Sequence, residues 1–135
     1  MTQRLTIEEY KAFLKKPKRP NTLSRGNKAK ANMGWVMIDT ARRLDLTLEK
    51  EYRFNPARRW RSDFALFGEH NGKEVKILVE YEGLGFHKTG HTDSEGYTKN
   101  CAKYNDAQAR GWIVLRFTYQ NYEDLSAELR KLLKS

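Results

Sequence analysis

The chain has 135 residues, of which 39% are hydrophobic and 12% aromatic, so it is long enough for one hydrophobic core and too short for two. It contains neither an apolar run near the roughly 20 residues of a membrane helix nor a signal peptide, so we expect a cytoplasmic protein (in a bacterial or phage-infected host cell) with no membrane partner. The single cysteine, Cys101, excludes an intrachain disulfide and a pair of metal-binding thiolates.

The charge is divided unevenly along the chain, whose formal net charge is +9. Residues 1–62 contain 16 Lys or Arg and 6 Asp or Glu, whereas residues 63–135 contain 10 and 11. A basic half beside acidic residues favours an enzyme that acts on a polyanion, because lysine and arginine neutralise phosphates. A basic tail that serves only solubility is the alternative.

The N-terminal part predicts a helix followed by an arm. Thr6–Leu14 begins with an N-cap residue, and Glu9 completes a capping box. Lys15–Lys30 is basic, contains two prolines and has little to bury, so we expect an extended arm that becomes ordered on nucleic acid. The chain is therefore divided into an N-terminal helix and arm, residues 1–30, and a single domain, residues 31–135.

The second helix is predicted over Ala31–Leu44, where apolar residues recur at spacings of three and four. This pattern is typical of an amphipathic helix that packs on a sheet. Asp39 lies off the apolar stripe. It is either a fourth acid near a metal or a solvated residue paired with Arg42 or Arg43.

Three strands follow, and the second and third form a predicted hairpin. Leu48–Asn55 is the first strand, and Trp60–Phe67 and Val75–Glu82 alternate as the next two. The break between them, Gly68–Glu74, contains Asn71-Gly72, a dipeptide that supplies the positive φ angles of a tight turn.

The hairpin carries three carboxylates within apolar strands. Asp63 lies in its first strand, and Glu80 and Glu82 share one face of its second. Because a carboxylate there is costly to desolvate without a positive charge, their convergence favours a divalent ion such as Mg²⁺, bound by Asp63 and Glu80. The alternative is that Asp63 pairs with Arg59 or Arg61 while both glutamates lie on a solvated face.

The turn into the hairpin contains three arginines: Arg58, Arg59 and Arg61. They crowd the approach to Asp63, and we expect them to position phosphates. Their alternative partners are the nearby carboxylates of Glu49, Glu51 and Glu82.

The segment Gly83–Gly96 has four glycines, no periodicity, and the histidines His87 and His91. It begins where the strand with two acids ends, and such loops often carry chemistry. Either histidine could activate water or protonate a leaving group, because imidazole titrates near neutrality. Solvent-exposed histidines without a task are the alternative.

A long helix is predicted over Glu95–Arg110. Lys99 and Lys103 lie one turn apart, where they could clamp a phosphate or face solvent. The predicted inner stripe is Tyr97, Cys101, Tyr104 and Gln108.

The C-terminal part predicts a buried strand over Trp112–Phe117 and a last helix from Asn121, which acts as its N-cap. The predicted inner face of this helix is Tyr122, Leu125, Leu129, Leu132 and Leu133. The order helix, helix, three strands, helix, strand, helix predicts an α/β fold with a mixed β-sheet flanked by helices.

Asp63, followed 17 residues later by Glu80-x-Glu82 at a strand end and then by a helix and a strand, resembles the PD-(D/E)XK nuclease superfamily. The likeness extends over about Glu49 to Thr118. Its motifs are E-Y-R-F-N-P-A-R-R-W-R-S-D-F-A, V-E-Y-E-G, G-H-T, G-Y-T-K-N-C-A-K-Y-N-D-A and G-W-I-V-L-R-F-T. These runs resemble small phage and prophage nucleases of the Holliday junction resolvase kind, with the very-short-patch-repair fold.

The resemblance implies a restriction-endonuclease-like core and makes Asp63 and Glu80 the metal-binding acids. Glu82 stands where the superfamily usually has lysine, and would orient the attacking water or hold a second metal. His91 matches a histidine of the phage group and would relay a proton or contact phosphate. Lys103 would supply the missing cation. Asn100 stands where that group is expected to have an acid.

The implied activity is hydrolysis of DNA phosphodiesters by a homodimeric, Mg²⁺-dependent Holliday junction resolvase, with Mn²⁺ as a possible substitute. A nicking, mismatch-repair or restriction-type endonuclease, or a non-catalytic nucleic-acid-binding module, is the alternative. The expected DNA-binding residues are Arg58, Arg59, Arg61, Lys88 and Lys99.

Overall fold

The computed structural model describes residues 6–14, 25–83 and 93–134. The helices are α1 (Ile7–Leu14), α2 (Arg25–Leu44), α3 (Asp93–Ala109) and α4 (Leu125–Leu133), and the strands are β1 (Thr47–Tyr52), β2 (Ser62–His70), β3 (Lys73–Tyr81) and β4 (Ile113–Phe117). A short 3₁₀ turn, Tyr122–Asp124, precedes α4. The predicted order of helices and strands is confirmed.

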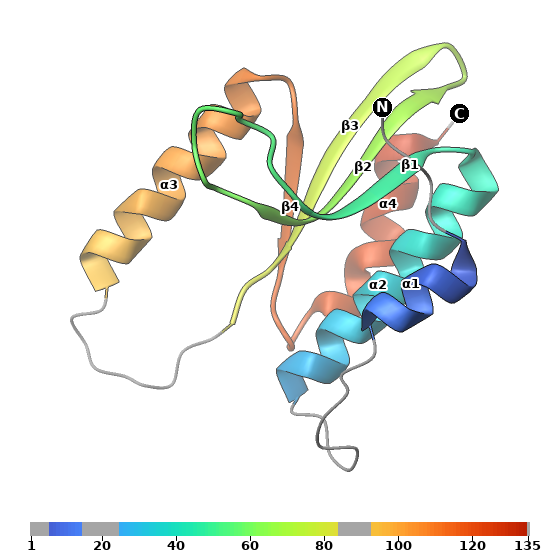
Figure 1. The fold of residues 1–135 in the computed structure, drawn as a ribbon, viewed down its shortest axis with the longest axis horizontal. Helices are drawn as coiled ribbons and strands as arrows, with labels where there is room; N and C mark the ends of the chain where they lie inside the picture. The colour runs from blue at the N-terminus through green and yellow to red at the C-terminus, as the bar shows by residue number, and fades with distance from the viewer. Residues whose placement is uncertain (1–5, 15–24, 84–92, 135) are drawn as a thin grey trace.

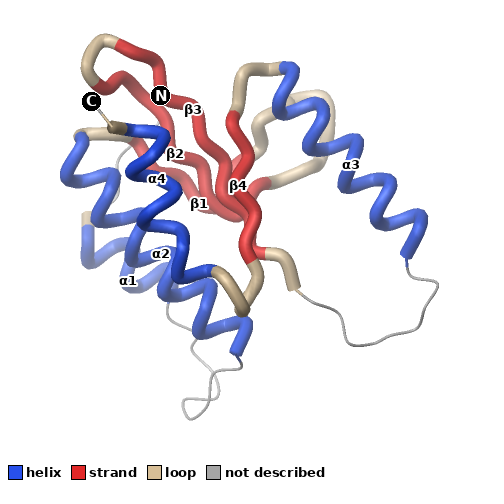
Figure 2. Tube along the Cα trace, turned by 180° about the vertical axis from the view of Figure 1, so that it is seen from behind, coloured by secondary structure: helices blue, strands red, loops and turns tan. Residues whose placement is uncertain are grey.

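The strands form one mixed sheet in the order β1-β2-β3-β4. Neighbouring strands from β1 to β3 are antiparallel, whereas β4 is parallel to β3. Helices α1, α2 and α4 lie on one side of the sheet and α3 on the other (Figure 1, Figure 2). Because β2 is antiparallel to β3 and β4, β2 begins at the same end of the sheet at which β3 and β4 finish.

Both faces of the central strands are buried, which explains their nearly continuous apolar sequences. Alternate residues of β2 and β3 pack either against α2 and α4 or against α3. The predicted stripe of α2 is confirmed. The larger cluster includes Met33, Met37, Phe64, Leu66, Ile77, Val79, Leu125 and Leu129, and the smaller one contains Phe54, Ala65, Leu78, Ala107 and Trp112.

The boundary of the predicted N-terminal arm is wrong at its C-terminal end. Helix α2 begins at Arg25, six residues before Ala31, so residues 25–30 are helical. Ala29 is fully buried and extends the four-residue spacing of Met33 and Met37 back by one turn. The basic residues around it concealed this continuation.

The hairpin turn is shorter than predicted. Strand β2 continues to His70 and β3 starts at Lys73, which leaves only Asn71-Gly72 between them. Asn71 has φ 54° and Gly72 has φ 76°, the signs that a type I′ turn requires. The ends of the strands are polar because they are exposed, and this polarity suggested a loop.

The inner stripe predicted for α3 is confirmed at Tyr104 and wrong at its three other residues. Tyr97 is 67% exposed, and Cys101 and Gln108 are exposed as well. The residues that α3 turns inward are Lys103, Tyr104, Asp106 and Ala107. This face is largely polar because α3 covers charged groups at the end of the sheet, so apolar spacing could not identify it.

Of the two helix caps predicted at the ends of the chain, one is confirmed and the other is wrong. The capping box is confirmed, since the Thr6 N–H donates to Glu9 at 2.9 Å and the Glu9 N–H donates to the Thr6 hydroxyl at 3.0 Å. Asn121 does not cap the last helix, because its side-chain oxygen accepts the Thr118 N–H at 2.8 Å. On the predicted inner face of α4, Leu132 is exposed.

Across residues 6–14, 25–83 and 93–134, no helix has the length and apolar character needed to cross a membrane.

Replacing Gly72 by alanine isolates the cost of the turn conformation. A Cβ there would meet no atom within 4 Å, so the loss should come from its positive φ alone, about 1 kcal/mol in the free energy of unfolding. Gly83 offers the same open space without a positive φ. In urea denaturation, Gly83→Ala should therefore be neutral or stabilising, and equal losses in both variants would contradict this assignment.

Candidate functional site

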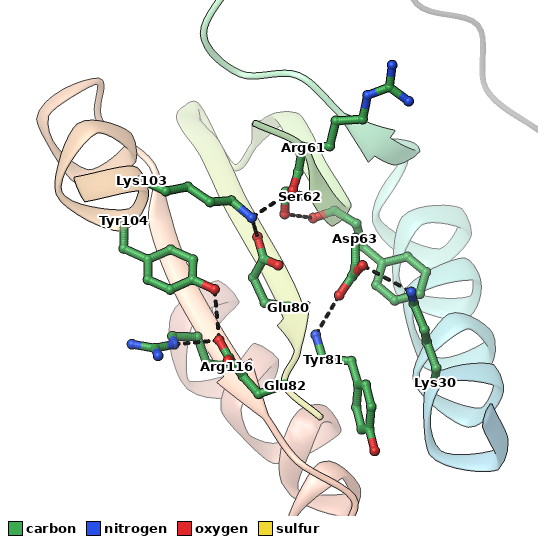
Figure 3. A network of polar contacts seen from close by, with 11 residues as sticks. Lys30, Arg61, Ser62, Asp63, Glu80, Tyr81, Glu82, Lys103, Tyr104 and Arg116 are labelled. Atoms are coloured by element: carbon green, nitrogen blue, oxygen red, sulfur yellow. Dashed lines mark hydrogen bonds and ion pairs between the residues drawn. The ribbon is translucent and has the colours of Figure 1, made fainter. Parts of the chain in front are cut away.

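Three carboxylates gather where β2 begins and β3 ends: Asp63, Glu80 and Glu82 (Figure 3). We call these three residues the acidic edge. Each carboxylate contacts a different basic side chain, and these come from α2, α3 and β4. The hairpin places the three acids at neighbouring strand ends, but their side chains do not converge on one point. Asp63 is turned toward α2, Glu80 toward α3 and Glu82 toward β4.

Asp63 is held by one backbone donor and one lysine. Its Oδ2 accepts the Tyr81 N–H at 2.7 Å, and its Oδ1 lies 3.1 Å from Lys30 Nζ. The Asp63 side chain takes the place of a strand partner for Tyr81, because Phe64 and Val79 are the last residues paired between β2 and β3 at this end. The partner of Asp63 is therefore Lys30, and not Arg59 or Arg61 as the alternative interpretation had it.

Glu80 is a buried carboxylate with an incomplete set of partners. Lys103 Nζ lies 3.2 Å from its Oε2 and also donates to the Arg61 carbonyl at 2.7 Å. Burial raises the pKa of Glu80 to about 6, although Lys103 acts in the opposite direction. Within the part of the chain that the structure describes, Oε2 accepts no hydrogen bond of good geometry. The solvated face proposed as an alternative for Glu80 is wrong.

Glu82 is more fully satisfied. Its Oε2 accepts the Tyr104 hydroxyl at 2.8 Å and Arg116 Nε at 2.9 Å. The Arg116 guanidinium also lies 4.3 Å from the centre of the Tyr104 ring. Burial and the neighbouring carboxylates raise the pKa of Tyr104, so its hydroxyl remains a hydrogen-bond donor.

The structure brings some of the predicted site residues to the acidic edge and places others away from it. Lys103 reaches the acidic edge, whereas Lys99 is exposed on α3. Asp39 lies elsewhere and pairs with Arg43 at 3.0 Å, as one of its two predicted roles required. His87, Lys88 and His91 lie outside the described residues.

The three predicted arginines are exposed in the connection between β1 and β2, residues 53–61, which we call the arginine loop. Arg58 stacks over Trp60 at 4.7 Å. Among the residues that the structure describes, no ion pair joins Arg58, Arg59 or Arg61 to a carboxylate. Their guanidinium groups are thus exposed to solvent, and Figure 3 shows the Arg61 side chain directed away from the three acids.

Two polar side chains fix the arginine loop. Arg53 donates to the carbonyls of Arg58 and Pro56 at 3.0 and 2.8 Å. The buried Asn55 donates to Asp106 of α3 at 2.9 Å. These contacts tie the loop backbone to the Arg53 side chain and join the loop to α3.

Sequence reasoning did not assign Lys30, Tyr104 and Arg116 to the site. Lys30 could have been found by extending the helical spacing of α2 back through Ala29. Arg116 could have been found from the crossover between β3 and β4, because such a connection predicts parallel pairing of the two strands. The contact of Tyr104 with Glu82 has no signal in the local pattern.

The acids fit a hard divalent ion in part. Glu80 is buried, Asp63 lies on the adjacent strand, and a hard ion can be bound by one or two carboxylates, but Glu80 Oε2 is already 3.2 Å from Lys103 Nζ. In residues 6–14, 25–83 and 93–134, no three His, Cys, Asp or Glu side chains form a group that could hold one metal. The remaining ligands would therefore be water and substrate oxygens.

No protein-family model, curated protein or solved structure matches this chain.

Glu80 should make stability depend on pH. Folding raises the pKa of Glu80 from 4.5 to about 6, so the folded state binds this proton more tightly than the unfolded state does. The bound proton adds about 2 kcal/mol to the free energy of unfolding below pH 4.5, and this addition is lost as the pH rises through 6. Urea denaturation in EDTA should show the free energy of unfolding of Glu80→Gln, relative to wild type, increasing by this amount between about pH 4 and 8. A difference that is constant with pH would contradict the burial of an ionised Glu80.

Proposed function

We propose that this chain is a Mg²⁺-dependent, structure-specific DNA endonuclease with a restriction-endonuclease-like core and the acidic edge as its active site. The observation that carries the proposal is the buried, incompletely partnered Glu80 next to Asp63 at the meeting point of β2 and β3. The resemblance to the PD-(D/E)XK superfamily supports it, because β2, β3, α3 and β4 follow one another in the order which that resemblance implies.

Asp63 and Glu80 would hold Mg²⁺, or Mn²⁺ in its place, which when bound lowers the pKa of a water ligand and stabilises negative charge on a phosphodiester under in-line attack. Figure 3 shows Asp63 directed at Lys30 and Glu80 at Lys103. Loading the site therefore requires both lysines to give up their ion pairs. Lys103 would then be free to contact the phosphate that is cleaved.

DNA is the proposed substrate because the loop that leads into β2 and the helix that carries Lys103 present exposed cations. The arginine loop presents Arg58, Arg59 and Arg61, and Lys99 is exposed one turn before Lys103. These charges would bind backbone phosphates and thereby fix the position of the strand. A four-way junction is the preferred DNA on the strength of the resemblance, with nicked, mismatched or sequence-specific duplex as the competing substrates.

A homodimer is part of the proposal. Paired cuts on opposite strands of a junction need two active sites related by a two-fold axis, and one chain of this size supplies one.

A second candidate is a non-catalytic nucleic-acid-binding module. It is favoured by the ion pairs of Asp63 and Glu80 with lysines 3.1 and 3.2 Å away, since both acids have counter-charges without a metal. Such a module would bind DNA through the arginine loop and leave it intact.

Asp63→Asn should reduce cleavage of a labelled four-way junction in Mg²⁺ by about 100-fold or more, because it removes a metal-binding charge. Asparagine retains an oxygen to accept the Tyr81 N–H, so the strand ends should stay in place. The matched control is Asp39→Asn, which removes an exposed acid that pairs with Arg43 and should leave the rate unchanged.

The substrates and metal decide among the alternatives. Symmetric cuts in the junction, absent in EDTA and in linear duplex of the same arms, would support a resolvase. Equal cutting of both DNAs would retain the nuclease and discard junction specificity. Binding without cleavage in Mg²⁺ and Mn²⁺ would favour the binding module.

A further inference from the structure

Arg116 lies beside the acidic edge and pairs with Glu82, the carboxylate that is not one of the two expected metal ligands. We propose that Arg116 binds a backbone phosphate of the nucleic acid, and that Glu82 and Tyr104 are positioning residues that fix its guanidinium. This inference rests on the proposed function in taking a nucleic acid as the ligand. It assigns to Glu82 a role different from orienting water or holding a second metal.

The sheet places Arg116 beside the expected metal ligand. Arg116 on β4 is the register partner of Glu80 on β3. Because directly paired residues of neighbouring parallel strands project to the same side, both side chains lie on the face that α3 covers. Arg116 nevertheless forms its ion pair with Glu82, the residue that directly follows β3, and not with Glu80. Glu80 is thereby left to Lys103 and to a metal.

The guanidinium is fixed on one side and open on the other. Glu82 accepts a hydrogen bond from Nε at 2.9 Å, and the Tyr104 ring lies 4.3 Å from the guanidinium carbon. Tyr104 also donates to the same Glu82 oxygen at 2.8 Å, which holds that carboxylate in place. The Arg116 side chain is 45% exposed, and no described side chain accepts from its two terminal nitrogens. Those nitrogens have the fork geometry that suits a phosphate.

A phosphate that approaches the three carboxylates needs a positive charge that is not already committed to a metal ligand. Three carboxylates repel a phosphate, and Lys30 and Lys103 each neutralise one expected metal ligand. The counter-charge of Arg116 is instead an acid whose oxygen already accepts two hydrogen bonds. Arg116 can therefore contact a phosphate without leaving Glu82, whether or not a metal is bound.

The chain offers a closely matched control. Arg110 pairs through Nε with Asp106 at 2.8 Å and is 42% exposed, which resembles the 2.9 Å pair and 45% exposure of Arg116. Arg110 lies at the other end of the sheet, because it precedes β4 while Arg116 lies near its end. Arg116→Gln and Arg110→Gln thus remove the same charge from similar pairs at different distances from the acids.

The test is binding of labelled junction and duplex DNA in EDTA, by fluorescence anisotropy over a series of salt concentrations. Arg116→Gln should weaken binding about tenfold and lower the slope of log affinity against log salt by about 0.9, the loss of one phosphate contact. Arg110→Gln should change affinity less than about twofold. Arg116→Lys and Tyr104→Phe should keep the slope and weaken binding by about two- to fivefold, because the charge remains but its orientation is lost.

Equal effects of Arg116→Gln and Arg110→Gln would overturn the inference. If Arg116→Gln fails to fold, wild-type binding by both Arg116→Lys and Tyr104→Phe would overturn it as well. A wild type that binds neither DNA would refute it together with DNA as the substrate of the proposed function. If the variants weaken DNA binding as expected but the wild type does not cleave DNA in Mg²⁺, the phosphate site is supported and the nuclease is refuted.

Discussion

The burial of Glu80 at the end of β3 is the constraint on which the rest of the site depends. A carboxylate in that position has to be compensated, and the only nearby ammonium in the described contacts, that of Lys103, lies 3.2 Å from Oε2 while it also serves the Arg61 carbonyl. Lys103 thus joins α3, β3 and the arginine loop. The incomplete compensation keeps the pKa of Glu80 at about 6 and leaves an oxygen suited to a cation. A buried carboxylate with a raised pKa is a feature of many functional sites, and the metal site that we propose would use it.

The topology of the sheet turns this single group into a site. The end of β3 meets the start of β2 because the hairpin is antiparallel, and it meets the end of β4 because the crossover through α3 makes that pair parallel. One edge therefore collects Asp63, the two glutamates and Arg116, while α2 and α3 contribute lysines from opposite sides of the sheet (Figure 3). Acids that would bind metal and cations that would bind phosphate are brought within one small region.

The sequence predicts the parts of this arrangement that follow local periodicity. Alternation identified the hairpin and its three acids, and the three- and four-residue spacing identified the core face of α2. The prediction for the inner face of α3 was correct at Tyr104 but missed Lys103, because the helix packs on charged groups there and polar contacts have no period. The contacts of Lys30 with Asp63 and of Arg116 with Glu82 join residues more than thirty positions apart. Only the pairing of the strands and the docking of the helices determine them.

The central claim is that Asp63 and Glu80 form a divalent-metal site. Binding of Mn²⁺, followed by the loss of its free-ion electron paramagnetic resonance signal, tests this claim without DNA or cleavage. We expect saturable binding to the wild type at neutral pH, a loss of at least about tenfold in affinity in Glu80→Gln, and an affinity within about threefold of wild type in Glu82→Gln, whose carboxylate holds Arg116. No saturable binding to the wild type, or equal affinity in Glu80→Gln, would contradict the account.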